Sequence, residues 1–209
     1  TQEELDRVVP VVEAIHKNLD AIISVDTSTP EVITQSAAAG AGLINDVRAL
    51  QREGALSAAA ATELPICLMH MQGQPRTMQR EPTYDDVVQN VGDFLTSRAA
   101  EAIQAGVHAS NIVFDPGFGF GKTLAHNLAL LAATPTLVAL GYPLLVGVSR
   151  KSMFEHLLNR QVDERLSASL AAATIAAMNG TALVRVHDVQ ETVDAVRLVS
   201  AVQQHKPNL

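Results

Sequence analysis

Six short apolar runs recur along the 209-residue chain, each ending in polar or charged residues and each separated from the next by a helical pattern. Continuous apolar runs are typical of strands that are buried on both faces, as in a parallel sheet covered by helices. The runs lie at residues 22–26, 43–46, 66–70, 112–115, 144–151 and 183–188. Because the carboxyl ends of parallel strands meet at one edge of a sheet, we expect the polar residues to gather there as an active-site face.

The number of runs limits the α/β fold to two arrangements. A β/α barrel closes with eight strands, so six runs predict either an open six-stranded sheet or the last six strand–helix units of a barrel. The chain opens in a helical pattern, within which Pro10 predicts a kink or a short break. No Ser/Gly/Pro-rich linker or charge block divides the sequence, and we expect a single domain over residues 1–209.

Charge and cysteine content argue against several classes of protein. The formal net charge is −7, whereas a nucleic-acid surface needs a clustered basic face. A local group of basic side chains can still bind a small anion. No apolar stretch reaches membrane-spanning length, and no His/Cys/carboxylate spacing indicates a zinc site. The single cysteine, Cys67, lies inside an apolar run, as expected for a core residue of a protein in a reducing compartment.

Local signals predict where several helices begin and end. Thr29 is a predicted N-cap, with Pro30 at the first helical position and Gly40 at the end of the helix. Asp188 and Glu191 have the spacing of a capping box at the start of the last helix. Further helices are predicted at residues 85–106, 153–158 and 163–178, and the polar stretch between residues 70 and 84 is predicted to be a functional lip.

The glycine run at residues 117–121 resembles two phosphate-binding motifs and matches neither. Pro116 occupies the first glycine position of a phosphate loop, and Gly121 comes one residue early for a dinucleotide fingerprint. One interpretation is a glycine-rich turn with two buried rings, Phe118 and Phe120. The other is a binding loop that presents a ring to a flat ligand over Asp115.

Six polar residues stand at or just after the predicted strand ends: Asp26, Asn45, Asp115, Lys151, Arg185 and His187. Each alone has a plain structural explanation as a helix cap, a turn residue or a surface charge. Together they indicate a binding site. The two carboxylates and the amide suit a flat heterocycle with adjacent N–H donors, whereas the two cations and the imidazole suit an anion such as phosphate. His70 also ends a run, but a structural histidine is an equally good interpretation.

These residues fall within motifs that resemble those of the bacterial dihydropteroate synthases. The motifs occur in the family's order and cover essentially the whole chain: SVDT (24–27), NDV (45–47), MHMQG (69–73), DPGFGFGK (115–122), SRKS (149–152) and RVHD (185–188). The family is a TIM-type (β/α)8 barrel, usually homodimeric and cytoplasmic. It joins p-aminobenzoate to 6-hydroxymethyl-7,8-dihydropterin diphosphate in folate synthesis, and sulfonamides compete at its site. The resemblance implies that this chain carries the last six of the eight units.

The resemblance also implies a role for each matching residue. Pterin diphosphate would be bound by Asp26, Asn45, Met69, Asp115, Gly147, Lys151, Arg185, Val186 and His187. Of these, Lys151, Arg185 and His187 would be catalytic. The p-aminobenzoate would be bordered by Phe120, Lys151 and Ser152, with its carboxylate facing the helix start at Ser152. Loss of diphosphate leaves a methylene cation conjugated with the pterin ring, which the arylamine attacks, so the chemistry needs no covalent nucleophile.

The family's first two strand–helix units have no counterpart in this sequence. In the family they cover the active site and supply a magnesium contact, so the resemblance implies Mg²⁺ as a cofactor, with no metal ligand in this chain. Two alternatives stay open: a methyltransferase barrel of the methyltetrahydrofolate:corrinoid type, and a non-catalytic pterin-binding chain. The methyltransferase shares the pterin recognition but has no diphosphate to hold. The basic residues at 149–152 and 185–187 therefore favour the synthase.

Overall fold

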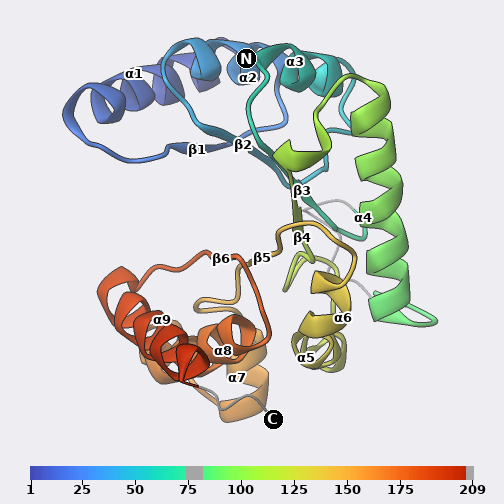
Figure 1. Cartoon of the computed structure of the whole chain (residues 1–209), viewed down its shortest axis with the longest axis vertical. Helices are drawn as coiled ribbons and strands as arrows, with labels where there is room; N and C mark the ends of the chain where they lie inside the picture. The colour runs from blue at the N-terminus through green and yellow to red at the C-terminus, as the bar shows by residue number, and fades with distance from the viewer. Residues whose placement is uncertain (74–81, 206–209) are drawn as a thin grey trace. The chain divides into compact units, whose positions relative to one another are not determined.

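The computed structural model describes residues 1–73 and 82–205, in which strands and helices alternate (Figure 1). The strands are β1 (Ser24–Asp26), β2 (Leu43–Asp46), β3 (Ile66–Met69), β4 (Ile112–Asp115), β5 (Leu145–Val146) and β6 (Leu183–Val184). The helices are α1 (Gln2–Asn18), α2 (Pro30–Ala38), α3 (Ala55–Thr62), α4 (Val87–Gln104), α5 (Leu124–Ala132), α6 (Thr134–Val138), α7 (Met153–Leu158), α8 (Leu166–Met178) and α9 (Val189–Gln204), with 3₁₀ turns η1 (Ala109–Asn111) and η2 (Val162–Glu164).

The chain divides into two units. The first comprises residues 1–70 and 93–114, and the second comprises residues 71–92 and 115–209. Helix α4 and strand β4 run across the boundary, so that Asp115, the last residue of β4, belongs to the second unit. The single domain expected over residues 1–209 stays a prediction.

The first unit is built on a parallel sheet in the order β1-β2-β3-β4. The register pairs Asp26 with Asn45 and Asn45 with Cys67, so the carboxyl ends of these strands lie side by side. Helix α1 packs against α2, and α2 packs against α3. Cys67 is completely buried in β3, as the apolar run around it predicts.

The second unit holds the parallel pair β5-β6, in which Val146 is the register partner of Val184. Helix α9 packs against α8; along the chain, α8 lies between β5 and β6, and α9 follows β6 (Figure 1). The α9 face toward its neighbours buries Thr192 and Val199, whereas Leu198 on the same helix is 66% exposed. The six predicted strand positions are confirmed, although β5 and β6 are shorter than their apolar runs because the residues that follow turn into loops.

Two predicted helix starts are confirmed in position but not in capping chemistry. Thr29 precedes Pro30 at the start of α2, but its hydroxyl donates to Glu4 and accepts from Arg52 instead of capping the helix. Asp188 precedes α9 without making a side-chain cap, so the predicted capping box is wrong. In both cases a charged partner from another element competes successfully for the oxygen, because charge-assisted hydrogen bonds are the stronger ones.

Other local predictions are confirmed in part. Helix α1 continues through Pro10, so no break occurs there. The helix predicted at 163–178 begins only at Leu166, because Gln161 and Glu164 bond reciprocally around a 3₁₀ turn ahead of it. Residues 74–81 of the predicted lip lie outside the described residues.

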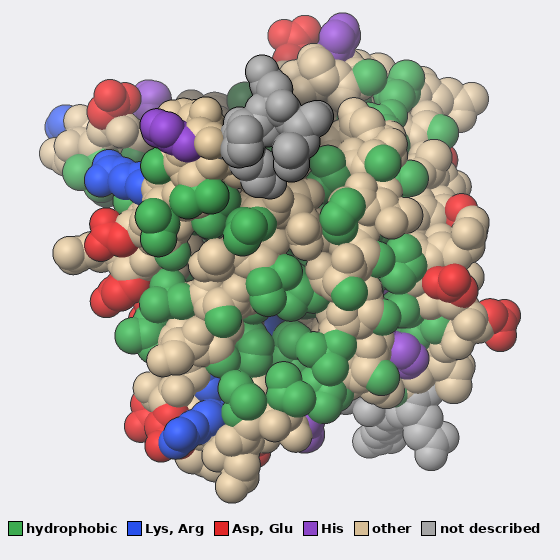
Figure 2. Space-filling model, turned by 60° about the horizontal axis from the view of Figure 1, so that its bottom comes forward, with side chains coloured by type: hydrophobic (Ala, Val, Ile, Leu, Met, Phe, Trp, Pro, Cys, Tyr) green, Lys and Arg blue, Asp and Glu red, His purple; other side chains and the backbone are tan. Residues whose placement is uncertain are grey.

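Apolar side chains reach the surface in the second unit. Val189 and Val202 of α9 are 60% and 49% exposed. Figure 2 shows hydrophobic side chains spread over one face of the molecule, with charged groups mostly toward its rim. Within the described ranges, no helix has both the length and the hydropathy that a membrane span requires.

Candidate active site

The first unit places two predicted site residues, Asp26 and Asn45, opposite one another at the ends of β1 and β2. Asn45 is 3% exposed, and within residues 1–73 and 82–205 neither its amide nitrogen nor its amide oxygen has a hydrogen-bond partner. A buried amide without partners is costly, so both polar atoms of Asn45 are candidates for hydrogen bonds to a ligand that offers an acceptor and a donor. Asp26 is exposed at the neighbouring strand end.

Asp46, which directly follows Asn45, holds this edge of the sheet in place. It is completely buried, and its carboxylate accepts the backbone N–H groups of Arg48 and Leu50, each at 2.9 Å. It also accepts the hydroxyl proton of Ser28, which follows β1. The loops after β1 and β2 are therefore tied together by one carboxylate. Asp46 is not among the predicted site residues, although a carboxylate at the end of a buried strand is a sequence signal for such a role.

Met69 ends β3 and is completely buried there. The next residue, His70, is 6% exposed and packs edge-on against the ring of Phe94, with 5.0 Å between the ring centres. This packing supports the structural interpretation of His70.

Asp115 is a buried acid of the second unit. It is 1% exposed, and its Oδ1 accepts the backbone N–H of Gly117 at 2.7 Å. Its Oδ2 lies 3.8 Å from Nη2 of Arg185 and has no hydrogen-bond partner within the described part of the chain. Burial raises the pKa of this carboxyl, although the positive charge of Arg185 and the Gly117 hydrogen bond oppose that shift. Oδ2 is thus an acceptor available to a ligand.

Lys122 is a functional candidate that the sequence analysis missed. Its ammonium is buried and donates to the carbonyl oxygens of Gly117 and Phe120, at 2.9 and 3.0 Å. Burial lowers the pKa of Lys122 to about 7, against the opposing effect of Asp115. The side chain closes the glycine loop by bonding both of its ends. The signal in the sequence is a lysine directly after the glycine run, at the end of the DPGFGFGK motif.

The two rings of the glycine loop have different environments. Phe118 is 1% exposed and belongs to the core, whereas Phe120 is only partly buried. The Nζ of Lys151 lies 4.3 Å from the centre of the Phe120 ring. Burial lowers the pKa of Lys151, and Arg185 adds to that effect. Of the two interpretations of the glycine run, the turn with two buried rings is therefore wrong for Phe120, whose ring contacts the Lys151 ammonium.

Five predicted site residues of the second unit line one pocket of about 260 Å³. Its lining consists of Gly147, Ser149, Lys151, Arg185, Val186 and His187. Gly147 makes room for the guanidinium, because a Cβ there would lie 3.1 Å from Nη2 of Arg185. The pocket thus combines an ammonium, a guanidinium and an imidazole with hydrogen-bonding loops, which is a donor set for an anion.

The loops that form this pocket are linked by a charged pair. The guanidinium of Arg150 binds the carboxylate of Asp188, with 3.1 Å between Nε and Oδ2. This hydrogen bond lowers the pKa of Asp188 and raises that of Arg150. Arg150 has a left-handed backbone, with φ +56°, which is unusual for a residue with a side chain. The pair joins the segment after β5 to the start of α9.

Ser152 lies at a second cavity, of about 400 Å³. It shares the lining with Pro82, Lys122, Thr123, Leu124, Asn127, Met153 and His156. Phe120 and Lys151, the other two residues predicted to border p-aminobenzoate, do not line this cavity, so their shared role with Ser152 stays a prediction.

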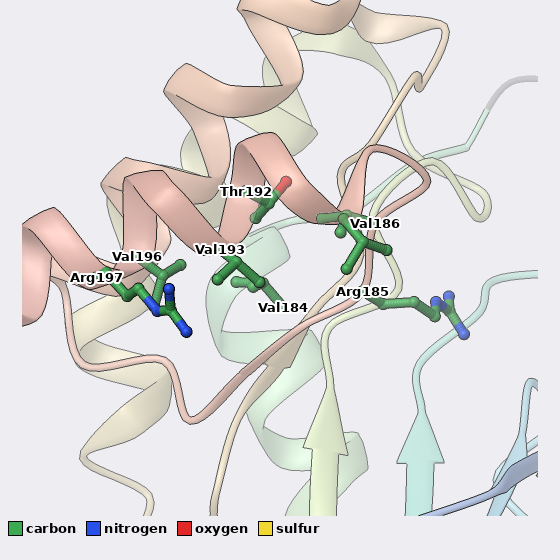
Figure 3. A pocket seen from close by; sticks show the side chains of 8 residues that line it. Val184, Arg185, Val186, Thr192, Val193, Val196 and Arg197 are labelled. Atoms are coloured by element: carbon green, nitrogen blue, oxygen red, sulfur yellow. The ribbon is translucent and has the colours of Figure 1, made fainter. Parts of the chain in front are cut away.

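A third cavity, of about 450 Å³, lies beside α9 and is mainly apolar. Figure 3 shows Val184, Val193 and Val196 in a row, with Arg185 and Arg197 at opposite ends. It shares Arg185 and Val186 with the anion pocket, and its other polar lining residues are Thr192 and Arg197.

The predicted residues thus form two groups, one in each unit. Asp26, Asn45 and Met69 lie at strand ends of the first unit, and the remaining residues lie in the second. That Asp26 and Asn45 open to the same pocket as Asp115 and Lys151 stays a prediction.

Comparison with known proteins identifies the family. The sequence pattern of the family described as "Pterin binding enzyme" matches residues 1–187. Dihydropteroate synthase of Escherichia coli K12 is 55% identical over 207 residues, which are 99% of this chain and 73% of that protein.

Solved structures agree with the sequence match. A crystal structure of Yersinia pestis dihydropteroate synthase in a sulfonamide drug complex superposes with a TM-score of 0.96 at 54% identity, covering 98% of this chain and 75% of the other. A second structure of the Y. pestis enzyme, with a pterin–sulfa conjugate, has a TM-score of 0.92 at 52% identity, covering 98% of this chain and 78% of the other.

These neighbours are TIM barrels, and the six parallel strand–helix units described above belong to that fold. Of the two arrangements that six strands allowed, the barrel is therefore confirmed. The chain is a member of the pterin-binding enzyme family and, within it, of the dihydropteroate synthases.

Proposed function

We propose that this chain carries the substrate-binding wall of a dihydropteroate synthase, which condenses 6-hydroxymethyl-7,8-dihydropterin diphosphate with p-aminobenzoate and releases diphosphate. One observation carries the proposal. A buried carboxylate with an unused oxygen, Asp115, lies beside a pocket that contains Lys151, Arg185 and His187, in a chain 55% identical to such an enzyme. A heterocycle-binding acid next to an anion pocket matches a substrate that joins a pterin to a diphosphate.

The pterin ring would be held by complementary hydrogen bonds. The amino and ring N–H groups of a pterin are donors, and Oδ2 of Asp115 is an acceptor without a hydrogen bond among the described residues. The amide of Asn45 offers a donor and an acceptor that are both unused there. Asp26, its register partner, would add a further acceptor. Burial strengthens the bonds to Asp115 and Asn45, because water does not compete for the same atoms.

The diphosphate would occupy the pocket lined by Lys151, Arg185 and His187. As the bond between the methylene carbon and the diphosphate oxygen breaks, negative charge grows on the leaving group. Two cations and an imidazole donor already in place stabilise that charge without reorganisation. The methylene cation, delocalised over the pterin ring, is then attacked by the arylamine nitrogen, which loses a proton as the new C–N bond forms.

The p-aminobenzoate would lie along Phe120, Lys151 and Ser152. The partly exposed Phe120 ring offers a flat surface, and the Lys151 ammonium stands over that ring. The carboxylate of the substrate would point to Ser152 at the start of α7. Sulfonamides, present in a related structure, would compete for this position.

The Mg²⁺ that the resemblance implies does not fit the described residues as ligands. Within residues 1–73 and 82–205, no group of three or more His, Cys, Asp or Glu side chains could hold a metal ion. Asp115 is already engaged with Gly117 and lies near cations, which would oppose a metal ion there. We therefore propose Mg²⁺ only as an ion accompanying the diphosphate. Calorimetry should show Mg²⁺ binding with diphosphate present and none without it.

Binding experiments on the 209-residue chain separate this function from the alternatives. A pterin and inorganic diphosphate should each bind, and pterin diphosphate with p-aminobenzoate should release diphosphate. Binding of the pterin without any diphosphate affinity would favour the methyltransferase type instead. Binding of both ligands without turnover would favour a non-catalytic chain.

Two further properties of the family are proposed for this protein. We expect a homodimer and activity in the cytoplasm, a reducing compartment consistent with the buried thiol of Cys67. Sedimentation equilibrium and fractionation of cells that express the protein test these two expectations.

A further inference from the structure

Ser149 and His187 form a reciprocal contact at the rim of the anion pocket. The backbone N–H of His187 donates to Oγ of Ser149 at 3.2 Å. The same Oγ lies 2.9 Å from Nδ1 of the His187 ring. Ser149 is 6% exposed, whereas His187 reaches into solvent at the pocket. A single hydroxyl therefore contacts both the backbone and the ring of one histidine.

Hydrogen-bond accounting favours one form of the ring. A serine hydroxyl has one proton to donate, and the backbone N–H of His187 already uses an acceptor position of the oxygen. Within the described ranges, both contacts of this hydroxyl run to His187, and the hydroxyl proton is used in one of them only when Nδ1 is the acceptor. A neutral imidazole whose Nδ1 accepts carries its own proton on Nε2.

We propose that Ser149 is a positioning residue that holds His187 in its Nε2–H form, so that the ring donates to the diphosphate in the pocket. The inference rests on the proposed function, because it names the diphosphate as the acceptor. Phosphate oxygens only accept hydrogen bonds, so a ring with its proton on Nδ1 would present a lone pair to an anion. The serine thus fixes the proton of the neutral His187 ring on Nε2, which then donates to the anion.

The surrounding structure keeps this contact in register. Next to Ser149, the backbone N–H of Arg150 donates to Oγ of Ser169 at 2.9 Å. Next to His187, the carboxylate of Asp188 binds the Arg150 guanidinium. Two consecutive residues of one loop are thus linked to two consecutive residues of the other. The histidine cannot rotate away without losing both its ring contact and its backbone contact to the serine.

The test reads the tautomer directly. Protein with ¹⁵N-labelled histidine side chains is measured by NMR over a pH series, and the tautomer is read from the alkaline end, where the His187 signals no longer change with pH. The His187 signals are assigned from their loss in His187→Gln. We expect a protonated Nε2 and an unprotonated Nδ1. A protonated Nδ1 in the unmodified protein overturns the proposal without any variant.

Three variants link the tautomer to binding. Ser149→Ala should give a mixture of the two His187 tautomers. It should also lower the affinity for inorganic diphosphate about fivefold, as measured by calorimetry, which is the effect of losing one hydrogen bond. Ser149→Thr keeps the hydroxyl and should restore both readouts. Ser36→Ala removes a buried hydroxyl of α2 and should change neither. Unchanged tautomer and affinity in folded Ser149→Ala overturn the proposal. Absence of diphosphate binding to the unmodified protein would instead refute the proposed function, and the tautomer measurement would still stand.

Discussion

The ammonium of Lys151 lies 4.3 Å from the centre of the Phe120 ring, above the face that the glycine loop presents. The ring attracts the cation through its quadrupole and also excludes water from one side of it. Gly119 permits this approach, since a Cβ there would lie 3.2 Å from Cδ of Lys151. The position of the lysine therefore depends on a ring and on a missing side chain in the loop after β4.

Phe120→Leu should raise the KM for p-aminobenzoate about two- to tenfold, the range expected from one cation–π contact. The reason is that leucine fills the space but offers no aromatic face to Lys151 or to the substrate. Phe120→Tyr keeps the face and should stay near the unmodified value. Steady-state kinetics at saturating pterin diphosphate measures both, and equal KM values for the leucine and tyrosine variants would contradict the contact's role.

Asp115→Asn should weaken pterin binding by about 1.5–3 kcal/mol, as is typical when a hydrogen bond to a charged group is lost. A carboxylate can accept two N–H groups, whereas an amide must present a donor to one of them. Isothermal calorimetry with a pterin measures the change. Asp163→Asn, at an exposed carboxylate in η2, is the matched control and should leave the affinity unaltered. If the Asp115 variant bound the pterin as tightly as the unmodified protein, Asp115 would have no role in pterin binding.

Lys122 should make the stability of the protein depend on pH. Its pKa is lowered from 10.5 to about 7 in the folded state, mainly by burial. Between these values the unfolded chain binds a proton that the folded chain does not. Stability should therefore rise with pH across this range, by up to about 1.4 kcal/mol per pH unit from this one group.

Lys122→Met removes that contribution. Urea unfolding of the variant from pH 7 to pH 10 should show a flatter dependence of the unfolding free energy on pH than the unmodified protein. Lys17→Met, at an exposed lysine of α1, should leave the slope as it is. Parallel curves for the Lys122 variant and the unmodified protein would mean that this lysine is charged in the folded state throughout the range.

The 209-residue chain should self-associate through the apolar surface beside α9. Val193 is 39% exposed and lines the cavity of Figure 3, and within the described residues β6 pairs only with β5. Exposed valines next to an open strand edge favour contact with another chain. Val193→Ser should shift sedimentation velocity profiles toward the monomer, whereas Val11→Ser on α1 should not. Identical profiles for the two variants would place the association elsewhere.

The strand ends could be predicted because burial leaves a strong trace in sequence. A strand covered on both faces reads as an unbroken apolar run, so the first polar residue after it, such as Asp26 or Asp115, marks the active-site edge. No comparable trace exists for contacts between loops. Ser149 and His187 are 38 positions apart, and nothing near either residue indicates the other.

The capping box at Asp188 was wrong for the same reason. Local spacing identified an oxygen at the start of α9, but Arg150, from another loop, binds it. The role of Lys122 could not be predicted because its ammonium donates to two backbone carbonyl oxygens. Every residue has such an oxygen, so the sequence does not indicate which ones accept. Sequence thus locates residues that face the site, whereas the side chains that hold them are revealed by tertiary structure.

The basic pocket belongs to a chain whose formal net charge is −7, and this contrast bears on how quickly a substrate arrives. A diphosphate far from the protein is repelled by its net negative charge. Close to the pocket, attraction by Lys151 and Arg185 exceeds that repulsion. At physiological ionic strength the screening length is about 8 Å, which removes the distant repulsion while close attraction persists. The encounter rate in stopped-flow experiments should therefore rise as salt is first added, whereas it would fall from the outset for an anion-binding protein of basic overall charge.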